Sequence, residues 1–215
     1  MLKLNCKPST NVVLIVLIWK AQINATQARY GRFRSSILSV LMYLRIYKKF
    51  KKIPENCCGN LFTTMTTRFD QANESKMMGL NEFVDQVGGA IRNSIVEYAN
   101  VIEGPNDDED EFFSKVIMKP QIEISEDIRK GEVDFHIISS VRNFPFYEAD
   151  LSWGKVAWVS LVQRPHKGIL LMDGSSNGDR VEAWVTMDVE DMAYFEKDPN
   201  VALFLINQGR TRPKM

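Results

Sequence analysis

Two histidines, His136 and His166, are the side chains of this 215-residue sequence best suited to general acid–base chemistry at neutral pH. His136 falls in the alternating stretch Val-Asp-Phe-His-Ile-Ile-Ser-Ser, and His166 follows an Arg-Pro pair in a polar turn. Neither adjoins a serine or cysteine in a nucleophile elbow, and no metal, dinucleotide or phosphate-loop motif occurs. The sequence therefore predicts no catalytic residue and no metal site.

A crowded stretch from Phe144 to Lys155 reads Phe-Pro-Phe-Tyr-Glu-Ala-Asp-Leu-Ser-Trp-Gly-Lys and lies between two β-rich runs. It combines aromatic rings, two acids and a Gly-Lys pair, a mixture typical of loops that carry function. In a second interpretation, the aromatic rings only close the end of a sheet. Composition alone favours this second interpretation.

The composition indicates a folded chain, because 45% of the residues are hydrophobic and 27 basic residues balance 27 acidic ones. The segment from Met1 to Pro54 nevertheless carries eleven Lys or Arg residues and no acid. Its strand-like and loop-like patterns argue against a transit peptide, and it has no motif of a nucleic-acid-binding arm. The apolar run from Val12 to Trp19 is too short to cross a bilayer. We expect a cytoplasmic protein without nucleic-acid or membrane partners.

Hydrophobic periodicity predicts two long helices. Thr10 can cap the first, which runs to about Gln27 and is apolar almost all round, a pattern that predicts deep burial. The second extends from Leu80 to Ile102 and has one apolar stripe at three- and four-residue steps, so one face is expected to be core. The pair Gly88-Gly89 inside it predicts either a close packing contact or a kink.

Strands are predicted for β-branched and apolar runs that end in charged or glycine-containing turns. They are Ser36–Arg45, Leu61–Phe69, Val133–Val141, Val156–Val162, Ile169–Met172 and Val181–Met187. Gly174 to Gly178 is predicted to form a hairpin turn. Asp188 is predicted to cap a last helix, which Asp198-Pro199 ends. A partly helical segment, broken at Pro120, precedes the third strand.

The crowded stretch, read from Tyr147 as Tyr-Glu-Ala-Asp-Leu-Ser-Trp-Gly-Lys-Val, resembles the D-F-G-W-G-K-P motif of the plant BAHD acyltransferases in its usual Y-E-A-D setting. Other stretches resemble the family in the family's order: Pro8-Ser-Thr with Leu17-Ile-Trp-Lys, Leu44-Arg45 with Pro54-Glu-Asn and Gly59-Asn-Leu-Phe, Ile169–Asp173, Val181–Val185 and Asp188–Met192. Within the family, the helical and closing segments most resemble the alkaloid and alcohol acetyltransferase branch. The resemblance implies an α/β fold, the C-terminal lobe of a chloramphenicol-acetyltransferase-like acyltransferase with a mixed sheet flanked by helices.

The resemblance also implies roles for the residues of the motif. Asp150 is expected to be a structural acid that forms a buried pair with Arg45. Trp153 and Gly154 are expected to shape the loop near the CoA channel, with Lys155 at its end. Leu151, Ser152 and Val156 replace the family's usual Phe, Gly and Pro, which predicts a less constrained loop.

The family's T-S-W, which lines the acyl pocket, reads Ser139-Ser140-Val141 in this chain. The resemblance implies that these residues line the substrate or CoA channel. Valine has no equivalent of the indole N–H donor of the usual tryptophan. Any hydrogen bond from that indole to a developing oxyanion is therefore lost.

The family's H-x-x-x-D motif, whose histidine is implied to be the general base, is absent, because Ser140 lies four residues after His136 and Leu170 four after His166. Residues 1–215 are therefore expected to be a single C-terminal lobe, with the N-terminal H-x-x-x-D lobe absent. The resemblance implies acyl transfer from acyl-CoA, a co-substrate and not a bound cofactor, to a hydroxyl or amine of a plant specialised metabolite. We expect the isolated, truncated chain to be inactive. The alternative is a non-catalytic lobe that complements a separate H-x-x-x-D lobe or interferes with a full-length relative.

Overall fold

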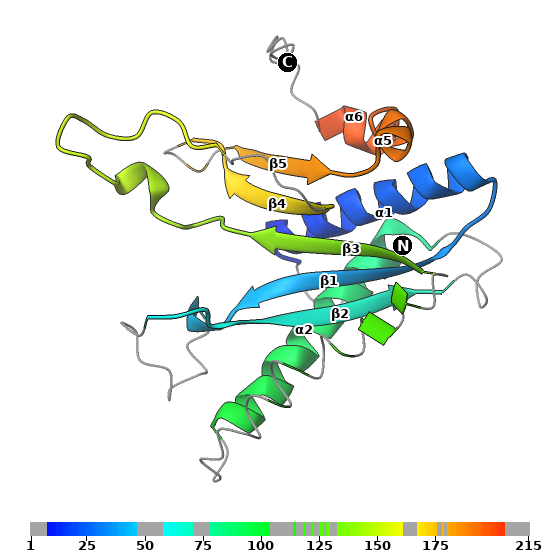
Figure 1. Ribbon diagram of the computed structural model, residues 1–215, viewed down its shortest axis with the longest axis horizontal. Coiled ribbons are helices and arrows are strands. Elements are labelled where there is room, and N and C mark those ends of the chain that lie inside the picture. Colours follow the sequence, from blue (N-terminus) through cyan, green and yellow to red (C-terminus); the bar gives the residue numbers. More distant parts are fainter. Residues whose placement is uncertain are drawn as a thin grey trace.

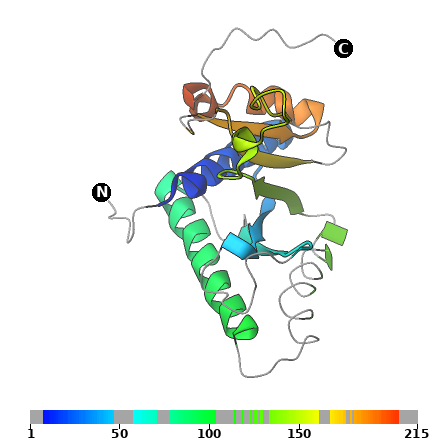
Figure 2. The same cartoon turned by 90° about the vertical axis from the view of Figure 1, so that its left-hand side faces the viewer.

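The computed structural model describes residues 8–46, 58–70, 78–103, 133–160, 167–175 and 180–204, together with Gly178 and single residues between 114 and 129. In these ranges the chain forms a five-stranded mixed sheet with two long helices across one face (Figures 1 and 2). Pro120 and His166 lie outside the described residues. Among the helices described, none has the length and apolar character needed to cross a membrane.

The sheet has the strand order β2-β1-β3-β4-β5. The strands are β1 (Ser35–Tyr43), β2 (Phe62–Phe69), β3 (Val133–Ser140), β4 (Gly168–Asp173) and β5 (Val181–Thr186). The three central strands are parallel, whereas each edge strand runs antiparallel to its neighbour. The carboxyl ends of β1, β3 and β4 consequently lie on one side of the sheet, where the segment after β3 projects outward (Figure 1).

The first predicted helix, α1 (Thr10–Tyr30), is buried on most sides because it packs between the sheet, α2 (Leu80–Ile102) and α5 (Val189–Phe195). It begins one residue after its cap, Ser9, whose hydroxyl accepts a hydrogen bond from the Val12 N–H at 3.3 Å. The fully buried Trp19 donates its indole N–H to the Ser36 hydroxyl of β1 at 2.8 Å. The predicted deep burial is confirmed, and one buried hydrogen bond ties the helix to the sheet.

The second predicted helix, α2 (Leu80–Ile102), is amphipathic as expected and packs against β2 and α1. Its Phe83 ring meets Trp19 edge to face, with 5.1 Å between the ring centroids. The helix continues unbroken through Gly88-Gly89. A Cβ added at Gly88 would lie 4.0 Å from a methyl group of Val12 in α1. At Gly88 the helix therefore lies at an ordinary van der Waals distance from α1, and an added Cβ would first meet the Arg92 side chain of the same helix, at 3.3 Å.

The strand predicted for Val156–Val162 is not formed by its described residues. Residues 156–160 are irregular, and residues 161 and 162 lie outside the described part of the chain. The physical reason is that β3 and β4 pair directly, with Ser139 opposite Leu170, while β5 occupies the other side of β4. The sheet therefore has no vacant position next to β4, although the apolar composition of this segment suits a strand.

The C-terminal part contains one element that the sequence prediction missed. The hairpin predicted at Gly174 is confirmed by the antiparallel pairing of β4 with β5, and α5 (Val189–Phe195) follows as predicted. The next residues form a short helix, α6 (Pro199–Phe204), where the sequence predicted no further helix. The Asp198 carboxylate accepts a hydrogen bond from the Asn200 N–H at 2.8 Å. Asp198-Pro199 therefore begins a helix as well as following one.

Candidate functional site

The site predicted from the sequence lies at the carboxyl ends of β3 and β4. Ser139 and Ser140 end β3, and the Val141 N–H donates to the Leu171 carbonyl of β4 at 2.9 Å. The three predicted channel residues, 139 to 141, are each partly buried. The structure brings them together at the edge from which the following segment projects. Their contact with a substrate or with CoA stays a prediction.

An ion pair that the sequence prediction missed holds this edge together. Arg142 follows β3 directly, and its Nε donates to Asp173, the last residue of β4, at 2.8 Å. Its Nη1 donates to the Asn11 side chain at the start of α1 at 2.9 Å. The Asn143 N–H donates to the second carboxylate oxygen of Asp173 at 2.7 Å. One arginine and one aspartate thus join two strands, a helix and the base of the projecting segment.

The surroundings of Asp173 favour its charged form. Burial alone raises the pKa of this carboxyl, but the Asn143 N–H, the hydrogen bond from Arg142 and the charge of Arg142 together lower the pKa below its ordinary value. The exposed fractions of the two side chains are 15% for Arg142 and 17% for Asp173, so water screens the pair weakly. In the sequence, Arg142 and Asp173 each come directly after a predicted strand, and this was the signal that could have revealed the pair, because the two strands are parallel neighbours in the sheet.

In the projecting segment, the motif residues Asp150 to Lys155 form a tight turn that is closed by hydrogen bonds between its own residues. A short 3-10 helix (Phe146–Glu148) precedes it. The Ser152 N–H donates to the Asp150 carboxylate at 2.8 Å, and Asp150 and Lys155 form an antiparallel bridge. The acid therefore orders its own loop. These contacts give Asp150 a structural environment, and they show no reacting group that it would serve.

The predicted buried pair between Asp150 and Arg45 is wrong for this structure, because Asp150 is exposed. Arg45, in the 3-10 turn after β1 (Leu44–Ile46), donates to the Tyr43 hydroxyl at 2.9 Å and to the Gly59 carbonyl at 2.6 Å. The physical reason is the position of the motif. It lies on a segment that projects beyond the strand ends, where its carboxylate remains in water and bonds a neighbouring backbone N–H instead.

Ser152 has the left-handed backbone conformation, with φ of 71°, at the position where the family motif has glycine. An L-residue pays about 1 kcal/mol or more for this conformation, and we expect Ser152→Gly to raise the free energy of unfolding by about 0.5 kcal/mol after the extra chain entropy of glycine is subtracted. Urea denaturation measures the change. Ala149→Gly is the matched control, because Ala149 has φ of −61° and should lose stability. Equal changes of the same sign in both variants would contradict the argument.

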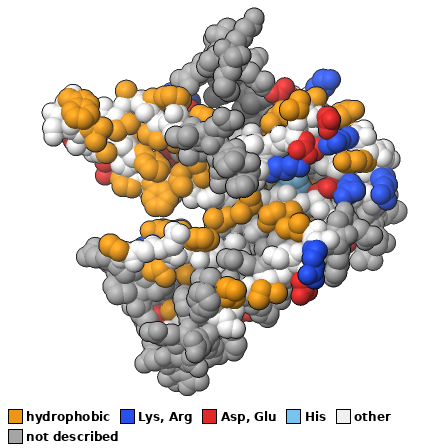
Figure 3. All heavy atoms as spheres, in the orientation of Figure 1, with side chains coloured by type: hydrophobic (Ala, Val, Ile, Leu, Met, Phe, Trp, Pro, Cys, Tyr) orange, Lys and Arg blue, Asp and Glu red, His pale blue; other side chains and the backbone are white. Residues whose placement is uncertain are grey.

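Several large apolar side chains on the projecting segment face solvent. Trp153 is 86% exposed, Trp158 is 52% exposed and Leu151 is 51% exposed. Figure 3 shows apolar side chains gathered over this segment, above a hollow that separates it from the lower part of the molecule. At the base of the segment, the Phe144 ring packs against Tyr43 of β1, with 5.6 Å between centroids. The exposed rings form a surface of the kind found at protein–protein contacts.

The described residues at this edge include serine hydroxyls and an ion pair, but no imidazole. His136 lies in the first half of β3 and borders a separate cavity. Burial, and then the charge of Lys167, lower the pKa of His136 to about 4, so its imidazole is neutral and weakly basic at pH 7. No group of three metal-ligating side chains occurs in the described part of the chain. The described arrangement at this edge can therefore hold the projecting segment in place.

Comparison with known proteins identifies a family. The model of the Transferase family matches residues 3–202. The pelargonidin 3-O-(6-caffeoylglucoside) 5-O-(6-O-malonylglucoside) 4'''-malonyltransferase of Salvia splendens is 30% identical over 190 residues, which are 88% of this chain and 44% of that protein. The acetyl-CoA-benzylalcohol acetyltransferase of Clarkia breweri is 29% identical over 165 residues, which are 76% of this chain and 36% of that protein.

The crystal structure of vinorine synthase resembles this chain with a TM-score of 0.64 and 23% sequence identity, over 88% of this chain and 41% of that one. The likeness confirms the expected fold, that of the chloramphenicol-acetyltransferase-like acyltransferases, with a mixed sheet flanked by helices. The chain spans less than half the length of the relatives that it matches.

Proposed function

Because this chain belongs to the Transferase family, and within it to the plant BAHD acyltransferases, we propose that it is part of an enzyme of acyl transfer. The reaction moves an acyl group from acyl-CoA to a hydroxyl, or to an amine, of a plant specialised metabolite. Acyl-CoA is a co-substrate in this reaction, and no bound cofactor is required. The observation that carries the proposal is the family match over residues 3–202, together with the motif that ends at Lys155.

Residues 1–215 form, in this proposal, a single lobe equivalent to the C-terminal half of a BAHD enzyme. The support is the match to less than half of each relative and the one continuous sheet. The names of two relatives describe malonyl and acetyl transfer, the second from acetyl-CoA to benzyl alcohol. A cytoplasmic location stays a prediction from the sequence.

The lobe alone is proposed to be inactive, because its 215 residues contain no H-x-x-x-D. General base catalysis needs an imidazole within hydrogen-bond reach of the acceptor hydroxyl. His136 is weakly basic in its buried setting and lies in the other half of β3 from Ser139 to Val141. A loop motif and a channel edge without a base can position substrates, but they cannot deprotonate an acceptor.

Incubating the purified chain with acetyl-CoA and a panel of alcohols that includes benzyl alcohol tests this inactivity. We expect release of free CoA thiol at the rate of the protein-free mixture, with no acetyl ester by mass spectrometry. The Clarkia breweri enzyme serves as the positive control for benzyl alcohol. If the chain forms the ester and the His136→Ala variant does not, the lobe has its own base and the proposal is wrong.

A second candidate function follows from the exposed apolar side chains of the projecting segment. Trp153, Trp158 and Leu151 are each more than half exposed, and apolar surface of this kind favours association. We propose that this surface docks on a separately made H-x-x-x-D lobe. In the same role the chain would interfere with a full-length relative by occupying that lobe. This function needs contact but no catalytic residue in the chain itself.

A further inference from the structure

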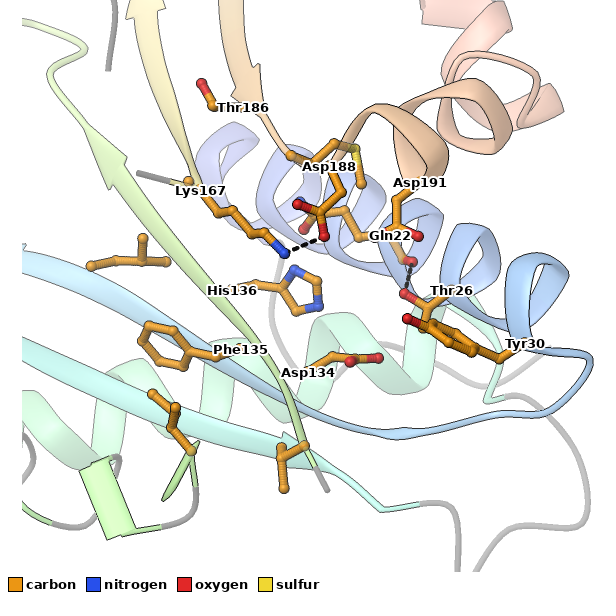
Figure 4. Close-up of a pocket in the computed structure, with 15 residues that line it drawn as sticks. Gln22, Thr26, Tyr30, Asp134, Phe135, His136, Lys167, Thr186, Asp188 and Asp191 are labelled. Carbon is orange, nitrogen blue, oxygen red and sulfur yellow. Dashed lines mark hydrogen bonds and ion pairs between the residues drawn. The ribbon is translucent and has the colours of Figure 1, made fainter. Parts of the chain in front are cut away.

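A cavity of about 580 Å³ opens at the end of β3 opposite to Ser139 and Ser140. Figure 4 shows it between the second half of α1, the first half of β3 and the start of α5. Its polar lining includes Gln22, His136 and Lys167, and its apolar lining includes Ile137 and Met187. A volume of this size is that of a small-molecule pocket, and it is many times the volume of one water.

Two neutral polar atoms in the lining have no partner among the described residues. Gln22 is only 3% exposed, and its side-chain oxygen accepts no hydrogen bond there. The Nε2 atom of His136 is buried and likewise unpaired. A buried amide or imidazole without a partner costs free energy, and nearly all such groups in native proteins are satisfied. The two atoms therefore mark places where an occupant of the cavity would form hydrogen bonds.

The charged side chains around the cavity already have opposite partners. Lys167 forms an ion pair with Asp188 beside the His136 ring, as Figure 4 shows. Asp191 is bound by Arg29, with 3.0 Å between Oδ1 and Nη1. Asp134, also in the lining, is bound by Arg34 with 3.0 Å between Oδ1 and Nε. Because these charged side chains already have opposite partners, they would attract a charged ligand only weakly. The cavity therefore favours a neutral ligand.

We propose that this cavity binds an uncharged, hydroxyl-bearing molecule with an apolar body, a neutral phenol or alcohol. A ligand hydroxyl would donate to the Gln22 side-chain oxygen, and a second hydroxyl would bond Nε2 of His136. The apolar body would lie against Ile137 and Met187. This binding site is separate from the edge that carries the acyltransferase motif, and the proposal stands without acyl transfer.

Tyrosol, which has a phenol at one end and an alcohol at the other, is a suitable probe. Isothermal titration calorimetry at pH 7 should show saturable binding of tyrosol to the full chain. The anion 4-hydroxyphenylacetate, of similar size and shape, should bind at least tenfold more weakly. Equal affinity for the two molecules would overturn the proposal, and so would the absence of saturable tyrosol binding, which would leave a water-filled cavity as the explanation.

Gln22→Leu should weaken tyrosol binding at least tenfold, because the leucine fills a similar volume without an acceptor. Gln27→Leu is the matched control, since Gln27 lies in the same helix and outside the cavity lining. His136→Leu gives a second test if the first variant does not fold. Unchanged affinity in a folded variant at either position would contradict the assignment. No acyl-CoA is present, so the result is independent of the acyl-transfer proposal.

Discussion

Arg142→Met is expected to lower the free energy of unfolding by about 2 kcal/mol, between the values typical of exposed and of buried pairs, because removing one member of a partly buried ion pair leaves the other charge unpaired. In this chain the unpaired charge would be that of Asp173, which is 17% exposed and would keep the hydrogen bond from the Asn143 N–H. The Asn11 side chain would also lose its donor. Urea denaturation followed by tryptophan fluorescence measures the loss.

A double-mutant cycle with Asp173→Asn separates the pair from the packing of each side chain. We expect the two substitutions together to cost less than the sum of the single ones, with a coupling of about 1 kcal/mol or more. Additive effects would show that the pair does not stabilise this edge. The comparison matters for function because Arg142 anchors the base of the projecting segment through Asp173 and Asn11.

The same pair gives an acid dependence with a defined sign. The pKa of Asp173 is lower in the folded chain than its ordinary value, so the unfolded chain binds a proton more readily. The stabilisation is therefore fully present above the ordinary carboxyl pKa of about 4 and is lost as the pH falls through the lower folded pKa. The double variant should lack this component of the acid-induced loss.

The helices and most strands could be predicted because local patterns determine them. The all-round apolar run of α1 and the single stripe of α2 required burial of the kind observed. The motif around Asp150 and Trp153 identified the family, and through it the fold. Family membership supplied what periodicity could not, namely that the parallel strands β1, β3 and β4 belong to one mixed sheet.

The remaining features depend on pairings that no local pattern contains. Residues 156–160 are apolar like a buried strand, but β3 and β4 already pair with each other. Asp150 has the environment of an exposed turn in place of the buried one that the family implied. Arg142 and Asp173 are 31 positions apart and become neighbours only through the parallel register. Helix α6 needed the Asp198 cap to be recognised as a start signal.

The exposed rings and the absent base lead to the same expectation, an enzyme divided between two chains or segments. Trp153 is 86% exposed on a segment whose base is held by a partly buried ion pair. A firmly anchored segment with exposed aromatic rings is suited to docking, because little ordering entropy remains to be lost on binding. The inactive lobe and the docking lobe are therefore two aspects of one proposal.

Co-expression with the part of the Clarkia breweri acetyltransferase that this chain does not match is expected to restore acetyl transfer to benzyl alcohol. The rate should exceed that of either part alone by about 100-fold or more, the usual contribution of a positioned general base. Trp153→Asp should reduce both co-purification and turnover, because it places a charge on the docking surface. Val189→Asp, on the equally exposed first residue of α5, is the matched control and should change neither.

The most direct test is the turnover of the purified two-part complex, with and without the histidine of H-x-x-x-D. Co-expression of the two parts of the Clarkia breweri enzyme itself provides the positive control. The proposal predicts acetyl ester from the complex, background from this chain alone, and background again when that histidine is replaced by alanine. Ester formation by this chain alone, or a complex that stays at background while the control is active, would contradict it.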